Sequence, residues 1–218
     1  IVITSAGNPS TWTPLLKSKS RIVLHVVSSA KFAKKAAAAG CDAVIAEGFE
    51  AGGHNGREET TTLVLIPAVV KAVHLPVIAA GGIATGRQLF AVLSLGAEGV
   101  QMGTRFVACE EASSHPDFKK MVISAAEGDT QLSLKKLTPV RLLKNKFYHE
   151  VHDAEERGAN PEELSVLLGK GRARKGMFDG DLNEGELEIG QVSALLDTIL
   201  PASTIIENTW NEFQEACA

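Results

Sequence analysis

Val77-Ile78-Ala79-Ala80-Gly81-Gly82-Ile83-Ala84-Thr85-Gly86 is the stretch that decides the fold class of this chain. It begins with a short apolar run, continues with two adjacent glycines, and leads into a helical pattern at Gly86. A near-continuous apolar run of this length is typical of a parallel strand that is covered on both faces. The stretch therefore predicts a buried strand, a tight turn and a helix start, which together form the basic unit of a parallel α/β fold.

The same unit recurs on both sides of this stretch. Short apolar runs, which we predict to be strands, lie at residues 1–5, 21–27, 43–46 and 99–102. Helical patterns lie between the runs, at residues 30–39, 63–74 and 86–95. In the first of these helices, Phe32, Ala33 and Ala36 are expected to face inward and the three lysines to face water. The alternation predicts a parallel sheet whose strands are joined by right-handed helical crossovers.

Two architectures compete for this pattern, an open doubly wound sheet and a (β/α)8 TIM barrel. The doubly wound fold is expected to carry Gly-x-Gly-x-x-Gly after its first strand, but Ala6-Gly7-Asn8-Pro9 stands there. Glycines follow the last two runs instead, where barrels bind phosphate after strands seven and eight. We therefore predict that the five apolar runs are strands 4–8 of a barrel. This interpretation implies that three βα units precede Ile1 and are absent from the chain.

The pattern changes after Thr104, and the sequence predicts two parts. Residues 1–126 are assigned to the barrel, and residues 127–218 to a mainly helical appendage near its mouth. Within the second part we expect a long helix through 139–157, a helix that starts at Asn160-Pro161, a loop at 169–185, and terminal helices at 189–200 and 202–218.

Composition and charge exclude several classes of function. The 218 residues carry 22 basic and 26 acidic side chains, a formal net charge of −4, so charge provides no argument for nucleic-acid binding. The longest apolar runs are shorter than the roughly 18–20 residues of a membrane span. Three widely spaced cysteines favour a reducing compartment, and we expect a cytoplasmic protein. The histidines and cysteines lack the spacing of a metal site, so no metal is predicted.

The first candidate site is the loop after the run at 43–46. It contains Glu47, the paired glycines Gly52 and Gly53, and His54. Loops at the carboxyl ends of barrel strands form the active site, and paired glycines let the backbone approach a ligand closely. His54 has few neighbours to pack against, and an imidazole exchanges protons near neutral pH. The competing interpretation is a surface loop with an exposed histidine, and on the pattern alone the two are about equal.

Two further loops have the character of phosphate sites. Gly81 and Gly82 precede a helix whose first amides and dipole would bind a phosphate, although a tight turn is the simpler interpretation. In the next βα turn, Gln101, Met102, Gly103 and Thr104 close the strand, and Gly103 permits close approach of the chain. Two such loops on consecutive strands predict a phosphorylated cofactor, for which flavin mononucleotide (FMN) is the leading candidate.

Five motifs in register resemble the nitronate monooxygenase family, which includes the FMN-dependent enoyl-acyl carrier protein reductases of the FabK type. The motifs are Thr4-Ser5-Ala6-Gly7-Asn8-Pro9, Asp42-Ala43-Val44-Ile45-Ala46-Glu47-Gly48, Glu50-Ala51-Gly52-Gly53-His54, Pro76-Val77-Ile78-Ala79-Ala80-Gly81-Gly82-Ile83 and Gly96-Ala97-Glu98-Gly99-Val100-Gln101-Met102-Gly103-Thr104-Arg105-Phe106. The resemblance is close from Thr4 to Asp129 and looser beyond, with Gly190-Gln191 near the expected place.

The resemblance implies a (β/α)8 barrel that binds FMN, with Glu47 and Gly52 near the flavin, Gly82 at its phosphate, and residues 101–104 closing the phosphate pocket. His54 matches the catalytic histidine of the family. The glycine-methionine segment and the asparagine that the family carries on its early strands have no counterpart here. We therefore expect weakened FMN binding by the chain alone, which full-strength flavin titration would contradict.

The resemblance also implies two activities. One is reduction of trans-2-enoyl thioesters in fatty acid biosynthesis, with NAD(P)H as co-substrate; the other is oxidation of alkyl nitronates with O2. We favour the reductase because Ala46-Glu47-Gly48 resembles its version of the motif, whereas the monooxygenase typically has glutamine at the position of Glu47. The expected partner is a small or acyl-carrier-bound substrate, and a homodimer is compatible with the sequence. A non-catalytic half-barrel module is the alternative from another class.

Overall fold

A five-stranded parallel sheet forms the centre of the computed structural model, which describes residues 1–218. The strands are β1 (Val2–Thr4), β2 (Val23–Val27), β3 (Ala43–Glu47), β5 (Val77–Ala80) and β6 (Gly99–Gln101), and they lie side by side in the order of the sequence. All neighbouring pairs are parallel, as in Val44 beside Val77. The predicted α/β class and all five predicted strands are confirmed. The sheet is open, with β1 and β6 at its edges.

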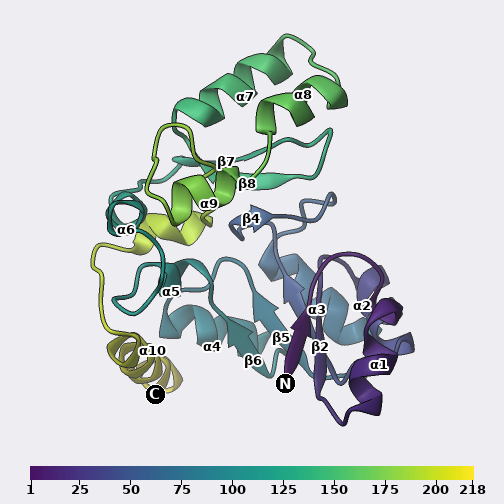
Figure 1. Ribbon diagram of the computed structural model, residues 1–218. Coiled ribbons are helices and arrows are strands. Elements are labelled where there is room, and N and C mark those ends of the chain that lie inside the picture. Colours follow the sequence, from purple (N-terminus) through teal and green to yellow (C-terminus); the bar gives the residue numbers. More distant parts are fainter.

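Helices cover one face of this sheet (Figure 1). They are α1 (Thr13–Ser18), α2 (Ala30–Ala38), α3 (Thr62–Ala72) and α4 (Gly86–Ser94), and the 3-10 helix η1 (Pro9–Thr11) precedes α1. A core of 16 buried residues joins alternate strand positions, such as Val44 and Ala79, to the helices. In α2, Ala33 and Ala36 are buried as predicted, but Phe32 is 40% exposed. The inward orientation expected for Phe32 is therefore wrong, because its side chain lines a cavity instead of the core.

The C-terminal helix packs against the helices of the sheet layer. Helix α10 (Ala202–Cys217) lies along α4 and contacts α5, as Figure 1 shows. Its Glu212 accepts a hydrogen bond from the amide of Gly86, the first residue of α4 (2.7 Å). The short helix α5 (Thr104–Val107) and helix α6 (Pro116–Ile123) follow β6 and lead toward the other lobe. Sequence-distant segments therefore meet at the start of α4.

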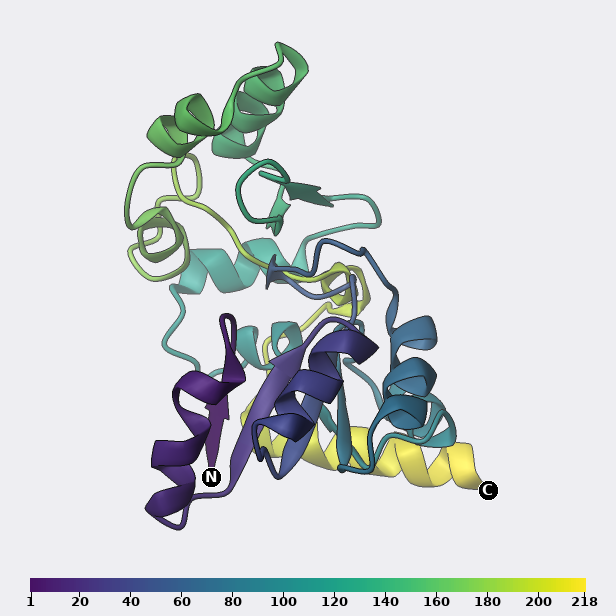
Figure 2. The same cartoon turned by 90° about the vertical axis from the view of Figure 1, so that its right-hand side faces the viewer.

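The second lobe lies over the carboxyl ends of the parallel strands (Figures 1 and 2). Its three-stranded antiparallel sheet has the order β4-β8-β7 and contains β4 (Gly53–His54), β7 (Thr130–Ser133) and β8 (Val140–Leu143). Its helices are α7 (Lys146–Glu156), α8 (Pro161–Leu168), α9 (Arg172–Met177) and the 3-10 helix η2 (Gln191–Leu195). The cap at Asn160, whose side chain accepts from the Glu163 amide, confirms the predicted start of α8.

Three expectations for this lobe are wrong. Residues 140–143 form a strand, because all four are buried and a continuous apolar run fits a buried strand as well as a helix. Residues 172–177 form α9 inside the predicted loop. The predicted helix at 189–200 is only the short η2, because the preceding residues extend along β8, where the Leu143 amide donates to the Leu187 carbonyl.

No helix has the length and apolar character needed to cross a membrane. The boundary predicted between residues 126 and 127 stays a prediction. The segment after it supplies α10 and all of the second lobe except β4.

Candidate functional site

The loop that carries His54 leaves β3 at Glu47 and enters β4. In β4, Gly53 pairs with Arg141 and His54 pairs with Val140 of β8. Successive residues of a strand point to opposite faces. A side chain at Gly53 would meet the Glu188 carboxylate, whose Oε2 lies 2.6 Å from the ideal Cβ position, so the backbone of β4 lies against Glu188. Pairing with β8 therefore fixes the direction of an exposed imidazole.

Arg141 of β8 binds the loop that carries His54. Its Nη2 and Nε donate to the Phe49 carbonyl at 2.8 and 3.2 Å, and its guanidinium stacks on the Phe49 ring 4.5 Å from the centroid. Burial lowers the pKa of Arg141, and the nearby Glu50 and Glu59 oppose that shift. A buried cation that binds loop backbone restricts the positions which the loop can take. The His54 loop is thus tied to the second lobe and does not lie free in solvent.

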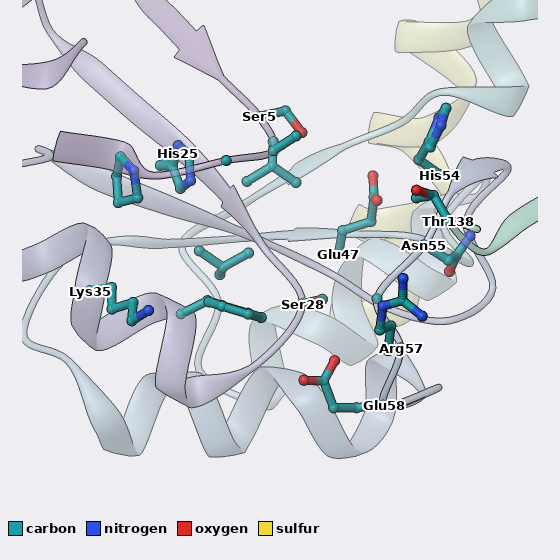
Figure 3. A pocket seen from close by; sticks show the side chains of 17 residues that line it. Ser5, His25, Ser28, Lys35, Glu47, His54, Asn55, Arg57, Glu58 and Thr138 are labelled. Carbon is teal, nitrogen blue, oxygen red and sulfur yellow. The ribbon is translucent and has the colours of Figure 1, made fainter. Parts of the chain in front are cut away.

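A cavity, which we call the first cavity, opens beside His54. It has a volume of about 440 Å³, and the labelled side chains in Figure 3 come from β2, from the carboxyl ends of β1 and β3, from α2, from the His54 loop and from the connection between β7 and β8. His54 and Asn55 lie on one side of the view and Lys35 on the other. The volume falls within the roughly 300–1,000 Å³ of small-molecule sites.

The second cavity, of about 250 Å³, lies next to the first, and Glu47 lines both. It gathers most of the residues predicted to bind a cofactor. They are Glu47, Gly52, Gly81, Gly82, Gln101, Gly103 and Thr104. The structure therefore brings together the ends of β3, β5 and β6.

Glycines form the wall of the second cavity for different reasons. Gly81 and Gly82 have φ of +82° and +72°, which L side chains rarely adopt, so the turn after β5 requires them. A Cβ at Gly103 would meet nothing within 4 Å. A Cβ at Gly52 would lie 2.3 Å from the backbone of Ile189, so Gly52 is needed for packing. The amides of Gly82 and Gly103 donate to no backbone carbonyl.

The prediction that the amides at the start of α4 bind phosphate is wrong. The amides of Ala84 and Thr85 donate to the Gln88 side chain at 2.8 and 3.1 Å, and the amide of Gly86 donates to Glu212. These donors already have partners within the chain. Any anion-binding donors of this loop are therefore the amides before the helix, at the glycine turn.

Carboxyl groups supply the charge of the second cavity. Burial raises the pKa of Glu47 to about 7, and it also raises that of Glu188, which the charge of His54 partly opposes. The third carboxylate, Glu50, accepts hydrogen bonds from the amide and hydroxyl of Thr62 at 3.0 and 2.9 Å. Thr62 begins α3, so Glu50 caps this helix. Near neutral pH, Glu47 is therefore distributed between its acid and its carboxylate.

Two predicted residues lie outside both cavities. Met102 packs against the core between sheet and helices, and Gly53 faces Glu188. Thr104 lines the second cavity, and its hydroxyl accepts from the Gly190 amide at 3.0 Å, which holds residues 189–191 against the cavity. Sequence analysis missed Glu188 and Arg141. No local pattern marked them, because each contributes through contacts with a distant segment.

Two curated relatives cover 88% of this chain. A Mycobacterium tuberculosis protein named as a monooxygenase is 37% identical over 205 residues, and the (3aS,4S,5R,7aS)-5-hydroxy-7a-methyl-1-oxo-octahydro-1H-indene-4-carboxyl-CoA dehydrogenase of Rhodococcus jostii is 33% identical over 229 residues. The matches cover 53% and 64% of those proteins. The chain thus spans about half to two thirds of the length of the curated relatives it matches.

Two solved structures share the arrangement. FabK from Thermotoga maritima superposes with a TM-score of 0.93 at 43% identity over 99% of this chain and 68% of that chain. Nitroalkane oxidase from Streptomyces ansochromogenes superposes with a TM-score of 0.80 at 30% identity over 100% of this chain and 65% of that chain. The family model described as nitronate monooxygenase matches residues 1–212. The chain therefore belongs to the nitronate monooxygenase family, as the sequence motifs predicted.

Proposed function

We propose that the second cavity holds the phosphate end of FMN. The amides of Gly82 and Gly103 are free of backbone partners and would donate to phosphate oxygens, and the hydroxyl of Thr104 lies beside them. The open space at the Gly103 Cβ position fits a ligand that approaches the backbone. The cavity has no lysine or arginine in its wall, so backbone dipoles would carry the binding. Gly52, Gly53, Gly81, Gln101 and Met102 remain proposed cofactor-binding residues, in which Met102 would contribute only backbone.

The first cavity is the proposed substrate site, and His54 its catalytic residue. Glu47 lines both cavities, so a group bound in one lies next to a group bound in the other. This shared wall is the observation that carries the proposal. His54 is exposed to the cavity while its backbone is held in β4. A held imidazole is able to deliver a proton to a bound substrate.

The reaction we propose is NAD(P)H-dependent reduction of a trans-2-enoyl thioester. FMN, when bound, supplies two-electron transfer between the nicotinamide and the thioester. His54 then donates a proton at the α-carbon or a hydrogen bond to the thioester carbonyl. Glu47, with its pKa raised to about 7, is only partly ionised beside the flavin near neutral pH. The similarity to FabK and to a CoA-thioester dehydrogenase supports a thioester substrate.

Nitronate oxidation is the alternative function. Relatives from Staphylococcus that are 35–36% identical carry nitronate monooxygenase in their names, and the nitroalkane oxidase structure has the same arrangement. In this alternative, His54 removes a proton from the nitroalkane carbon, with O2 as the oxidant. A small nitronate would occupy only the end of the first cavity next to His54.

Anaerobic reduction separates these functions. In one experiment the flavin-loaded protein is reduced with NADH or NADPH and then mixed with crotonyl thioester without O2; in the other, the oxidised protein is mixed with an alkyl nitronate without O2. Flavin reoxidation by the thioester supports the reductase, whereas flavin reduction by the nitronate, with no reoxidation by the thioester, contradicts it. A chain that binds no flavin and reacts with neither would instead support the non-catalytic half-barrel module.

We further propose that the parallel sheet is part of a (β/α)8 barrel. The strands follow sequence order and their helices share one face, whereas a doubly wound sheet reverses its strand order and places helices on both faces. Three free cysteines favour a cytoplasmic location. Exposed Ile206 and Trp210 on α10 are compatible with a homodimer, which sedimentation analysis would test. The 1–126 and 127–218 division is proposed as well, and limited proteolysis near residue 126 would test it.

A further inference from the structure

The first cavity extends well beyond His54. Figure 3 shows His54 and Asn55 on one side of the view and His25 and Lys35 on the other. The far end is lined by α2 and by the loop that follows β1. Its buried His25 is held by the Thr4 hydroxyl, 2.8 Å from Nδ1, and burial lowers the pKa of His25, which keeps the ring neutral. A ligand that contacts both ends must span the cavity from His54 to Lys35.

Lys35 is the free cation at this far end. It is exposed, and its Nζ lies 5.7 Å from the centroid of the Phe32 ring, which also lines the cavity. It takes part in no ion pair of the structure, in contrast to Lys17, which pairs with Asp42. The other cation of the wall, Arg57, donates to the carbonyls of Lys135 and Leu137, so it is already engaged. An anion at the far end would therefore meet Lys35.

The surroundings of Lys35 are basic in an acidic chain. Residues 1–41 contain six lysines and arginines and no aspartate or glutamate, although the whole chain has a net charge of −4. Lys31 and Lys34, on α2 with Lys35, are exposed and form no ion pair. The acids of the cavity wall are Glu47 and Glu58. Glu58 lies next to Gly56 and Ser28, at the other end of α2 from the last-turn Lys35.

We infer that Lys35 binds the 4′-phosphate of a pantetheine arm whose thioester reaches His54. The inference rests on the proposed reductase function and adds a second recognition point to the same cavity. An acyl-pantetheine phosphate is elongated, neutral along its length and anionic at one end, which matches a cavity with His54 at one side and Lys35 at the other. Phe32 supplies an apolar wall for the arm, and Lys31 and Lys34 add long-range attraction for the anion.

The test is a comparison of two ligands and two variants. Binding of butyryl-pantetheine 4′-phosphate and of butyryl-pantetheine is measured by calorimetry on the full chain with flavin. The saturated acyl group keeps the ligand from reacting. Lys35→Met retains the apolar stem and removes the charge, and Lys71→Met on α3 is the control, because Lys71 is also exposed and free of ion pairs. Circular dichroism checks the fold of both variants.

Lys35→Met is expected to lower the affinity for butyryl-pantetheine 4′-phosphate roughly fivefold to tenfold, as for one partly exposed charge-assisted contact. The affinity for butyryl-pantetheine should stay unchanged. Raised salt should reduce binding of the phosphorylated ligand only. Equal loss for both ligands, or loss for neither, overturns the inference while leaving the reductase proposal intact. If the original chain binds no thioester, the proposed function fails and the inference fails with it.

CoA and acyl carrier protein both present this phosphate. Butyryl-CoA and a butyryl carrier protein are therefore tested with the same variants. If Lys35→Met lowers the affinity for both ligands, Lys35 recognises the arm that they share. If it lowers the affinity for one of them, that ligand is the source whose phosphate binds Lys35. Loss with neither overturns the inference.

Discussion

Glu47→Gln is expected to change how stability depends on pH. Burial between the two cavities raises the pKa of Glu47 from its ordinary 4.5 to about 7. The folded protein therefore holds this proton over a pH range in which the unfolded chain has released it, so stability falls as pH rises from about 4.5 to about 7. A pKa difference of about 2.5 corresponds to about 3 kcal/mol at full development.

The substitution removes this cost because glutamine is neutral at every pH. From the two pKa values, the carboxyl costs about 1 kcal/mol at pH 5 and about 3 kcal/mol at pH 8. The stability of Glu47→Gln relative to the original protein should thus improve by about 2 kcal/mol between these pH values. Any packing change caused by the amide is independent of pH and cancels in this comparison.

Urea unfolding at several pH values between 5 and 8 measures the effect. Glu186, whose pKa burial also raises to about 7, is present in both proteins and cancels. Glu98→Gln is the matched control, because Glu98 is exposed and lies outside both cavities. A difference between Glu47→Gln and the original protein that is constant across the pH range would refute the argument from burial.

Three further substitutions test other parts of the site. His54→Ala should reduce turnover by roughly 100-fold to 10,000-fold with flavin absorbance retained, and unchanged turnover would remove His54 from the mechanism. Gly82→Ala should lower the affinity for FMN in a flavin titration. Gly128→Ala, at a glycine with a similar φ of +82° and no neighbour within 4 Å, should lower stability only, and equal FMN affinity in the two variants would contradict the proposed phosphate site at Gly82. Arg141→Met should cost roughly 2–4 kcal/mol in urea unfolding and speed hydrogen exchange in the His54 loop, and a loss no larger than that of exposed Arg87→Met would disprove the anchor.

The local pattern of the sequence was sufficient to predict the parallel sheet and the helices that cover it. Residues 77–80 form β5 as predicted, because a buried parallel strand is apolar on both faces and the pattern is contiguous. Helix α2 begins after Ser29, whose side chain accepts from the Phe32 amide, and the capping residue is again local. The glycines after β5 and β6 and the His54 loop were found for the same reason.

Contacts between distant segments escaped prediction. The amide of Gly86 at the start of α4, which was expected to bind phosphate, donates to Glu212, which is 126 residues away in sequence. Residues 140–143 were predicted to be helical, because an apolar run of four residues does not distinguish a buried helix from a buried strand. Arg141 in that strand reaches Phe49 across 92 residues, and no periodicity reports such a contact.

The sequence by itself determined the family, the parallel α/β class and the loops that supply the site, because each is encoded in contiguous residues. Only the tertiary structure decided what those loops enclose. Glu47 lines two adjacent cavities, Glu188 lies under β4, and Lys35 stands at the far end of the first cavity. These relations depend on how β8, α2 and α10 pack against the sheet. Packing joins residues by distance in space, and the spacing of residues along the chain carries no record of it.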